Sequence, residues 1–140
     1  MPTRTAQANW QGSLAKGNGH MKFADYDGPF TFASRFEAGK GTNPEELIGA
    51  AIAGCFSMAL SGDLGGAGFS PDEISTTAKV TVEPKDGGGF VISGIHLDTV
   101  ASVPGVSDAD FQRIAEGTKS ACPVSTALRA VPITLTAKLA

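Results

Sequence analysis

One segment limits the fold of this chain more than any other: a strong helix start followed by a long, almost wholly apolar run. Asn43 is a suitable N-cap, Pro44 fits the first helical position, and Glu46 follows Asn43 by three residues, as in a capping box. From there to Leu64 apolar residues fall on every side, and Gly65–Gly66 follow. This pattern is typical of a helix buried all round. We therefore expect one central helix that the remaining elements cover.

The segment before this helix predicts antiparallel strands. Apolar residues recur at short spacing over residues 8–36, and two glycine-containing triplets interrupt them. Gly and Asn at such positions favour tight turns. We therefore expect turns at Gly17–Gly19 and Asp27–Pro29, joining three strands.

The segment after the helix predicts a long hairpin. Apolar and polar residues alternate over residues 74–82, and Asp86–Gly89 is a turn sequence leading into a second run that starts at Phe90. The apolar phase of this second run shifts by one residue across Ser93–Gly94. Such a shift predicts a β-bulge there, which would bend the strand.

The C-terminal third predicts two helices and a strand. Ser107 can cap a helix whose apolar residues keep helical spacing as far as Ala121, and Cys122–Pro123 reads as the start of a second, short helix. Residues 131–139 alternate with period two, as in a strand. The predicted order is βββ-α-ββ-α-α-β, an α+β fold in a single domain spanning 1–140.

Charge and hydropathy exclude several classes of protein. Eleven basic and 14 acidic residues are scattered along the chain, so no basic patch for nucleic acid and no polybasic membrane anchor is evident. The N-terminus lacks the apolar core of a signal peptide, and the longest apolar run, residues 47–56, is too short to span a bilayer. We therefore expect a soluble, cytoplasmic protein with no nucleic-acid or membrane partner.

The chain has two cysteines, Cys55 and Cys122, in unlike settings. A stable structural cystine is not expected in a reducing cytosol, which leaves redox-active, metal-binding or unrelated cysteines. Cys55 lies in the apolar run, where burial raises a thiol pKa, so it would react only if a cation reached it. Cys122 precedes Pro123 at a helix start, which favours its thiolate; the alternative is a small buried residue before a proline kink.

Other chemical signatures are absent. Two distant histidines, His20 and His96, without a C-x-x-C pair do not make a zinc site. The sequence has no P-loop, no G-x-G-x-x-G motif and no Ser/His/Asp hydrolase elbow.

Two charged residues flank the start of the central helix. Arg35 stands before the loop that leads into it, where a guanidinium could stabilise a thiolate and orient a peroxide oxygen, or could be an ordinary solvated strand residue. Glu45 and Cys55 are about 15 Å apart along one straight helix. If both serve one site, a second subunit must supply one of them; otherwise Glu45 merely complements the helix dipole.

These residues occur in a pattern that closely resembles the OsmC-like branch of the OsmC/organic hydroperoxide resistance family. The resemblance covers essentially the whole chain and is carried by Arg35–Glu37, Gly41–Ala51, Ala53–Leu60 and Cys122–Ser125. The chain departs from the family pattern at Ile52 and Gly54, where His and Ala are common.

The resemblance implies a thiol-dependent peroxidase that reduces organic (alkyl or lipid) hydroperoxides in oxidative and osmotic stress defence. It also implies an intertwined homodimer with long buried central helices, antiparallel sheets and two sites at the subunit interface. By match, Cys55 is the peroxidatic cysteine, Cys122 the resolving one, and Arg35 and Glu45 activate the thiolate and bind peroxide.

The implied cycle runs through a Cys55 sulfenic acid and a Cys55–Cys122 disulfide, which a small dithiol of the lipoyl type reduces. No metal, flavin or haem cofactor is required. The alternative is a non-catalytic redox sensor or a small-molecule binding protein on the same dimer scaffold.

Overall fold

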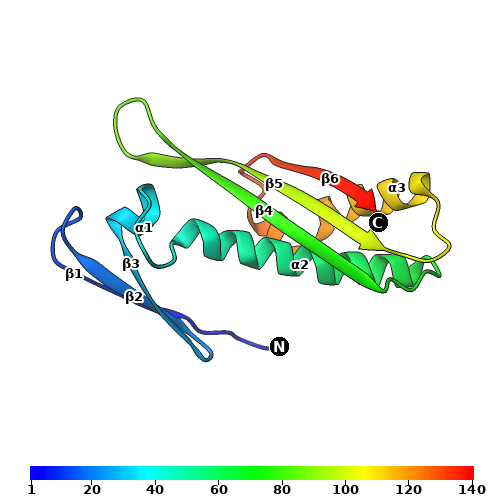
Figure 1. The fold of residues 1–140 in the computed structure, drawn as a ribbon, viewed down its shortest axis with the longest axis horizontal. Helices are drawn as coiled ribbons and strands as arrows, with labels where there is room; N and C mark the ends of the chain where they lie inside the picture. Colours follow the sequence, from blue (N-terminus) through cyan, green and yellow to red (C-terminus); the bar gives the residue numbers. More distant parts are fainter. The chain divides into compact units, whose positions relative to one another are not determined.

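The computed structural model describes residues 1–140, and the chain divides into two compact units, residues 1–47 and 48–140 (Figure 1). The first unit carries one three-stranded sheet and a short helix, and the second carries another three-stranded sheet with helices packed on it. The long helix α2 (Pro44–Gly66) starts in the first unit and continues into the second. The predicted α+β class is confirmed.

Three antiparallel strands form the sheet of the N-terminal unit, as predicted. β1 (Gln7–Gln11), β2 (Asn18–Phe23) and β3 (Tyr26–Thr31) lie in the order β1-β2-β3. Both predicted turns are wrong in position. The first loop ends at Gly17, whose N–H donates to Ser13 O at 2.7 Å. The second is the pair Ala24–Asp25, where Ala24 adopts a left-handed φ of 46°.

Two glycines of the predicted turns, Gly19 and Gly28, lie inside strands at positions where neighbouring groups come too close for a side chain. A Cβ on Gly19 would collide with Asn9 O and the Phe30 ring, and a Cβ on Gly28 would collide with the Tyr26 ring. Glycine within a strand commonly marks such a close approach. Tight turns and crowded positions in strands both favour glycine, which explains why these two glycines were predicted to lie in turns.

A short helix that the sequence pattern missed follows β3. α1 (Phe32–Phe36) begins after Thr31, whose hydroxyl accepts a hydrogen bond from Ser34 N at 3.0 Å, while Thr31 N–H donates to Ser34 Oγ at 2.8 Å. This reciprocal capping box satisfies backbone donors that a helix end leaves free. The observed order is therefore βββ-α-α-ββ-α-α-β.

The start of α2 is the one predicted. Asn43 Oδ1 accepts a hydrogen bond from Glu46 N–H at 2.8 Å, and Pro44 occupies the first helical position. The Glu46 carboxylate does not close the capping box and instead accepts from the Thr42 hydroxyl at 3.0 Å. The helix ends after Gly66, as expected.

The expectation of burial all round is wrong for α2 within one chain. Ile52, Phe56, Leu60 and Leu64 are fully buried, whereas Met58 on another side of the helix is 81% exposed. With 23 residues, α2 is long and apolar enough to cross a membrane. The short length of residues 47–56 therefore does not exclude a membrane-spanning helix. A soluble core helix meets the same criterion, although only 28% of the most apolar part of α2 is buried in this chain.

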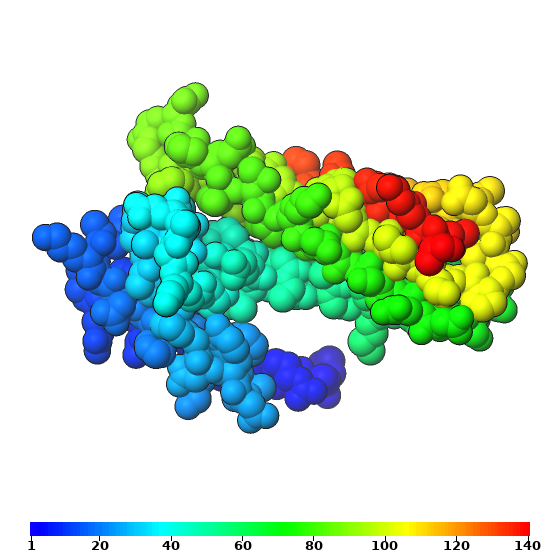
Figure 2. Space-filling model, viewed as in Figure 1, coloured from blue at the N-terminus to red at the C-terminus, as the bar shows by residue number.

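The C-terminal unit contains the predicted hairpin with its bulge. β4 (Glu73–Pro84) and β5 (Phe90–Ser102) pair antiparallel, and the turn between them projects from the rest of the unit (Figure 2). Thr81 pairs with Gly94 while Val82 pairs with Ile92. Ser93 is thus the extra residue, where the apolar phase shifted in the sequence.

The last strand makes this sheet mixed rather than antiparallel. α3 (Asp108–Ala121) and α4 (Pro123–Ala127) connect β5 to β6 (Ile133–Leu139), which runs parallel to β5. A crossover through helices returns the chain in the same direction, which a tight turn cannot do. Ser107 caps α3, as predicted, by accepting from Asp110 N–H.

The core of the C-terminal unit lies between its sheet and its helices. The buried face of α2 runs along the sheet (Figure 1), and the fully buried side chains include Ile52, Phe56, Leu60, Leu97 and Phe111. One polar chain crosses this layer: the Ser57 hydroxyl donates to Thr76 Oγ1 at 2.8 Å, which lies 2.9 Å from Thr99 Oγ1. This packing fixes the rotation of α2 and hence the direction in which Cys55 points.

Candidate active site: two cysteines and an arginine–glutamate pair

Cys122 sits where two helices meet. Its backbone N–H donates to Thr118 O at 3.0 Å at the end of α3, and its carbonyl accepts from Thr126 N–H at 3.0 Å within α4. Cys122 is therefore both the C-cap of one helix and the N-cap of the next, which confirms the predicted helix start at Cys122–Pro123. Its exposed fraction is 1%, so its position is fixed and shielded.

Ser125 makes two contacts with the sulfur of Cys122. Its N–H donates to Cys122 Sγ at 3.4 Å, and its hydroxyl lies 3.2 Å from the same sulfur. Donors directed at a sulfur stabilise its thiolate form. The fourth residue of the Cys122–Ser125 motif thus has a structural reason to be a serine.

Cys55 lies on α2 close enough to Cys122 for each thiol to affect the pKa of the other, and both cysteines are free thiols. Unlike Cys122, Cys55 is partly exposed. Two cysteines 67 residues apart in the sequence are therefore brought together by the fold. This arrangement suits reversible disulfide formation.

The two thiols have pKa values shifted in opposite directions. Burial is the largest effect at Cys55 and raises its pKa, opposed in part by the Val124 N–H and reinforced by the neighbouring Cys122. Burial also opposes ionisation of Cys122, but hydrogen bonds from Ser125, Cys55 and Val124 together bring its pKa below the ordinary value. The raised pKa of Cys55 agrees with the expectation that burial holds this thiol protonated unless a cation reaches it.

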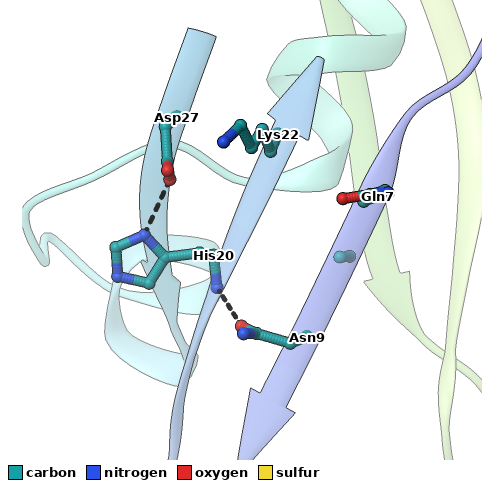
Figure 3. Close-up of a pocket in the computed structure, with 6 residues that line it drawn as sticks. Gln7, Asn9, His20, Lys22 and Asp27 are labelled. Carbon is teal, nitrogen blue, oxygen red and sulfur yellow. Dashed lines mark hydrogen bonds and ion pairs between the residues drawn. The ribbon is translucent and has the colours of Figure 1, made fainter.

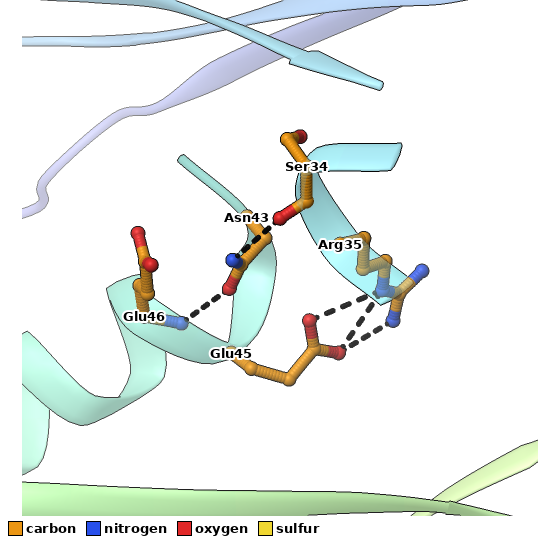
Figure 4. Close-up of polar contacts among 5 residues, drawn as sticks. All are labelled: Ser34, Arg35, Asn43, Glu45 and Glu46. Atoms are coloured by element: carbon orange, nitrogen blue, oxygen red, sulfur yellow. Dashed lines mark hydrogen bonds and ion pairs between the residues drawn. The ribbon is translucent and has the colours of Figure 1, made fainter. Parts of the chain in front are cut away.

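Arg35 and Glu45 form a close ion pair in the N-terminal unit (Figure 4). Arg35 Nη2 lies 2.7 Å from Glu45 Oε1, and Arg35 Nε lies 3.1 Å from both carboxylate oxygens. The Arg35 side chain is 38% exposed and that of Glu45 only 7%. The carboxylate is thus held inside while the guanidinium keeps an open side.

A hydrogen-bond frame holds this pair in place. The Asn43 side chain caps α2 with its oxygen and donates from Nδ2 to Ser34 O at 3.0 Å (Figure 4). The Ser34 hydroxyl donates to Thr42 O at 2.9 Å. These bonds join α1, which carries Arg35, to the start of α2, which carries Glu45. The reading of Arg35 as a strand residue is wrong, because Arg35 lies in α1.

An aromatic pocket of about 250 Å³ adjoins Arg35 in the same unit. The Trp10 and Phe30 ring centroids are 5.3 Å apart, and those of Phe32 and Phe36 are 5.0 Å apart. The lining is mainly apolar and consists of Trp10, Leu14, Phe30, Thr31, Phe32, Arg35 and Phe36. Sequence reasoning missed this pocket because it read the aromatic residues of 8–36 only as strand periodicity.

A second, polar pocket in the N-terminal unit surrounds His20 (Figure 3). His20 Nδ1 lies 3.0 Å from Asp27 Oδ1, and His20 N–H donates to Asn9 Oδ1 at 3.0 Å. Both ring and carboxylate are more than half exposed. No group of three or more His, Cys, Asp or Glu side chains gathers there or elsewhere in the chain.

The structure brings the predicted site residues together as two pairs, Cys55 with Cys122 and Arg35 with Glu45. Because α2 is one unbroken helix, Glu45 and Cys55 are separated along it by a rise of about 15 Å. The separation along the helix that the sequence predicts is therefore the one along α2.

Comparison with known proteins decides the family. Residues 37–136 match the family described as OsmC-like protein. The chain belongs to this family. This OsmC-like chain is 46% identical over 130 residues to the peroxiredoxin OsmC of Escherichia coli (strain K12), covering 91% of this chain and 90% of that protein. It is 33% identical over 104 residues to an organic hydroperoxide resistance protein of Xanthomonas axonopodis pv. citri, covering 70% and 68%.

Solved structures place the OsmC-like chain in the same fold. An OsmC like protein from Mycoplasma pneumoniae matches with a TM-score of 0.76 at 13% identity, over 99% of this chain and 97% of that one. An organic hydroperoxide resistance protein from Elizabethkingia anophelis matches with a TM-score of 0.68 at 27% identity, over 99% and 97%. The predicted family and the predicted OsmC-like α+β fold of the single chain are confirmed, and the intertwined homodimer stays a prediction.

Proposed function

We propose that this chain is a cysteine-based peroxidase that reduces organic hydroperoxides through Cys55 and Cys122. The observation that carries the proposal is the contact between two free thiols from distant parts of an OsmC-like chain. The names of the relatives, a peroxiredoxin and an organic hydroperoxide resistance protein, support the same enzyme class.

The cycle follows general thiol chemistry. The Cys55 thiolate attacks one oxygen of the hydroperoxide, the O–O bond breaks, and the alkoxide leaves and takes up a proton to become the alcohol. The Cys122 thiolate then attacks the Cys55 sulfenic acid, a disulfide forms, and hydroxide leaves as water after protonation. A small dithiol of the lipoyl type reduces the disulfide and is itself oxidised.

Arg35 supplies the cation that Cys55 needs. A guanidinium near the sulfur favours the thiolate, and its remaining donors can hold the peroxide oxygens. Glu45 orients the guanidinium by binding two of its nitrogens. Since Glu45 and Cys55 lie too far apart along α2 to act in one site of one chain, Arg35 and Glu45 of one subunit serve Cys55 of the other.

The active form in this proposal is a homodimer. A long apolar helix with a largely exposed outer side, including Met58 at 81%, is unstable in water unless another surface covers it. A second copy of α2 related by a two-fold axis covers it with the same residues. A dimer that covers this side of α2 would be soluble in water, and we propose that the protein works in the cytoplasm rather than in a membrane.

The aromatic pocket beside Arg35 supports an organic substrate. Its apolar lining can bury an alkyl or aryl group, while Arg35, its one charged lining residue, can bind the peroxide. Hydrogen peroxide has no apolar group to gain from this burial.

The proposal is tested by turnover. With dihydrolipoamide in excess, wild-type protein is expected to consume many equivalents of cumene hydroperoxide, and Cys55→Ser none. Cys122→Ser is expected to stop at one sulfenic acid on Cys55, detected by mass spectrometry. A single stoichiometric oxidation of wild type that then stalls would indicate a redox sensor instead.

Two further measurements test the shared site. Light scattering after size exclusion, without detergent, is expected to give about 28 kDa, twice the 14.2 kDa of one chain. Arg35→Met is expected to raise the pKa of Cys55, followed in a Cys122→Ser background by thiolate absorbance, while Arg129→Met, a matched exposed arginine, leaves it unchanged. A fully active monomer would exclude a site shared between subunits.

A further inference from the structure

The two sulfurs of the proposed redox pair differ in access and in hydrogen bonding. Cys122 is 1% exposed, whereas Cys55 is partly exposed. The Ser125 N–H and hydroxyl both contact Cys122 Sγ, and Ser125 is itself only 3% exposed. The Ser125 hydroxyl lies 3.2 Å from the sulfur, which is its hydrogen-bond partner. This serine is not needed to explain peroxide reduction at Cys55.

We propose that Ser125 is a positioning residue that makes Cys122 the leaving group when the disulfide is reduced, so that the reductant attacks Cys55. The inference rests on the proposed function, since it requires a Cys55–Cys122 disulfide. In the first step a reductant thiolate bonds to Cys55 Sγ, the Cys55–Cys122 bond breaks, and its electron pair leaves with Cys122 as a thiolate. In the second step the other thiol of the reductant, as thiolate, attacks the reductant sulfur of the mixed disulfide and releases Cys55 as a thiolate.

Two physical arguments support this direction. Thiol–disulfide exchange proceeds at the sulfur that the attacking thiolate can reach, which favours Cys55. It also proceeds faster when the departing thiolate is the more stable one. The N–H and the hydroxyl of Ser125 stabilise charge on Cys122, and the lowered pKa of Cys122 agrees with this.

The attacked sulfur can be identified directly in wild-type protein. The protein is oxidised with diamide, mixed briefly with glutathione, quenched with acid, alkylated and digested for mass spectrometry. Glutathione is expected on Cys55 and the alkyl label on Cys122. Glutathione found mainly on Cys122 would overturn the proposal.

The role of Ser125 is tested with Ser125→Ala, and Thr126→Ala serves as a matched control on the exposed side of α4. In a Cys55→Ser background, absorbance at the thiolate band is expected to show a higher pKa for Cys122 in Ser125→Ala only. With both cysteines present, reduction of the diamide-formed disulfide by dithiothreitol is expected to slow roughly tenfold. An unchanged pKa and an unchanged rate would overturn the proposal.

If Ser125→Ala does not fold, the glutathione assignment in wild type decides alone. No measurement here uses a hydroperoxide. Loss of peroxidase activity and failure of the leaving-group assignment are therefore distinguishable.

Discussion

Arg35 and Glu45 form an ion pair whose two members are unequally buried. The Glu45 side chain is 7% exposed and the Arg35 side chain 38%, although two guanidinium nitrogens contact the carboxylate. Removing one partner therefore leaves very different groups behind: a carboxylate shut away from water or a guanidinium that can still reach it.

This asymmetry predicts that Arg35→Gln destabilises the protein more than Glu45→Gln does. Loss of Arg35 leaves a buried carboxylate without its charged partner, which costs about 1 to 3 kcal/mol, whereas loss of Glu45 leaves a cation that water can solvate. Urea unfolding of both variants at pH 7 measures the difference. Equal losses of stability would show that Glu45 is as well solvated as Arg35.

The aromatic pocket predicts a change of substrate preference in Trp10→Leu. The indole packs against Phe30 and walls the pocket beside Arg35. Leucine removes part of the apolar surface that would hold an aryl group, so kcat/KM for cumene hydroperoxide should fall about tenfold while that for hydrogen peroxide stays constant.

The control for this prediction lies on the same sheet. Phe23 stacks on Tyr26 at 4.9 Å and does not line the pocket. Phe23→Leu should leave the ratio of the two rates unchanged. Equal falls for both peroxides in Trp10→Leu would assign the indole a purely structural role.

The ion pair of Lys79 and Asp98 predicts that the protein loses stability in acid. Lys79 Nζ lies 2.7 Å from Asp98 Oδ2, and this hydrogen bond lowers the pKa of Asp98, with smaller contributions from burial, which opposes it, and from His96. Because the folded-state pKa is depressed, the stabilisation is present above the unfolded pKa, about 4, and is lost as pH falls through the folded value.

The measurement compares urea midpoints at pH 6 and pH 3. Wild type should lose stability over this range more steeply than Lys79→Met. Lys138→Met, an exposed lysine of the same sheet, should follow wild type. Parallel curves for wild type and Lys79→Met would remove Asp98 from the acid response.

The chain of hydroxyl groups between α2 and the sheet predicts that Thr99→Val lowers the free energy of unfolding. Thr99 is 1% exposed, its hydroxyl donates to Ser75 O at 3.2 Å, and it lies 2.9 Å from the Thr76 hydroxyl. Valine keeps the shape but leaves the Thr76 hydroxyl without its acceptor, which costs about 1 to 3 kcal/mol. Thr77→Val, at an exposed position of the neighbouring strand β4, should change the unfolding free energy by less than about 0.5 kcal/mol.

Much of the fold follows from local signals in the sequence. Asn43 and Ser107 cap their helices as predicted because a short polar side chain before an apolar run has few other uses. The bulge at Ser93 was predictable because one inserted residue shifts the alternation of apolar and polar residues along a strand. Gly19 and Gly28 were wrongly predicted to lie in turns, because they are needed where aromatic rings come close to the backbone of a strand.

The site was predictable only in part. The contact between Cys55 and Cys122 depends on α2 and α4 packing in one unit, which no local pattern encodes; the family resemblance supplied it. Arg35 was placed on a strand because the Thr31–Ser34 capping box lies inside an aromatic-rich segment that resembles a strand. Ser125 was noticed only as part of a motif, since its role is visible only as contacts with a sulfur.

The position of Cys122 between two helices affects how fast the proposed disulfide can form. Backbone bonds to Thr118 and Thr126 anchor it on both sides, and Cys55 already lies close enough for each thiol to affect the pKa of the other. For the proposed redox pair, closing the disulfide then calls for movement of the Cys55 side chain rather than for local unfolding over microseconds or longer. A short path from Cys55 to its partner would shorten the time during which a second peroxide molecule can oxidise the sulfenic acid irreversibly.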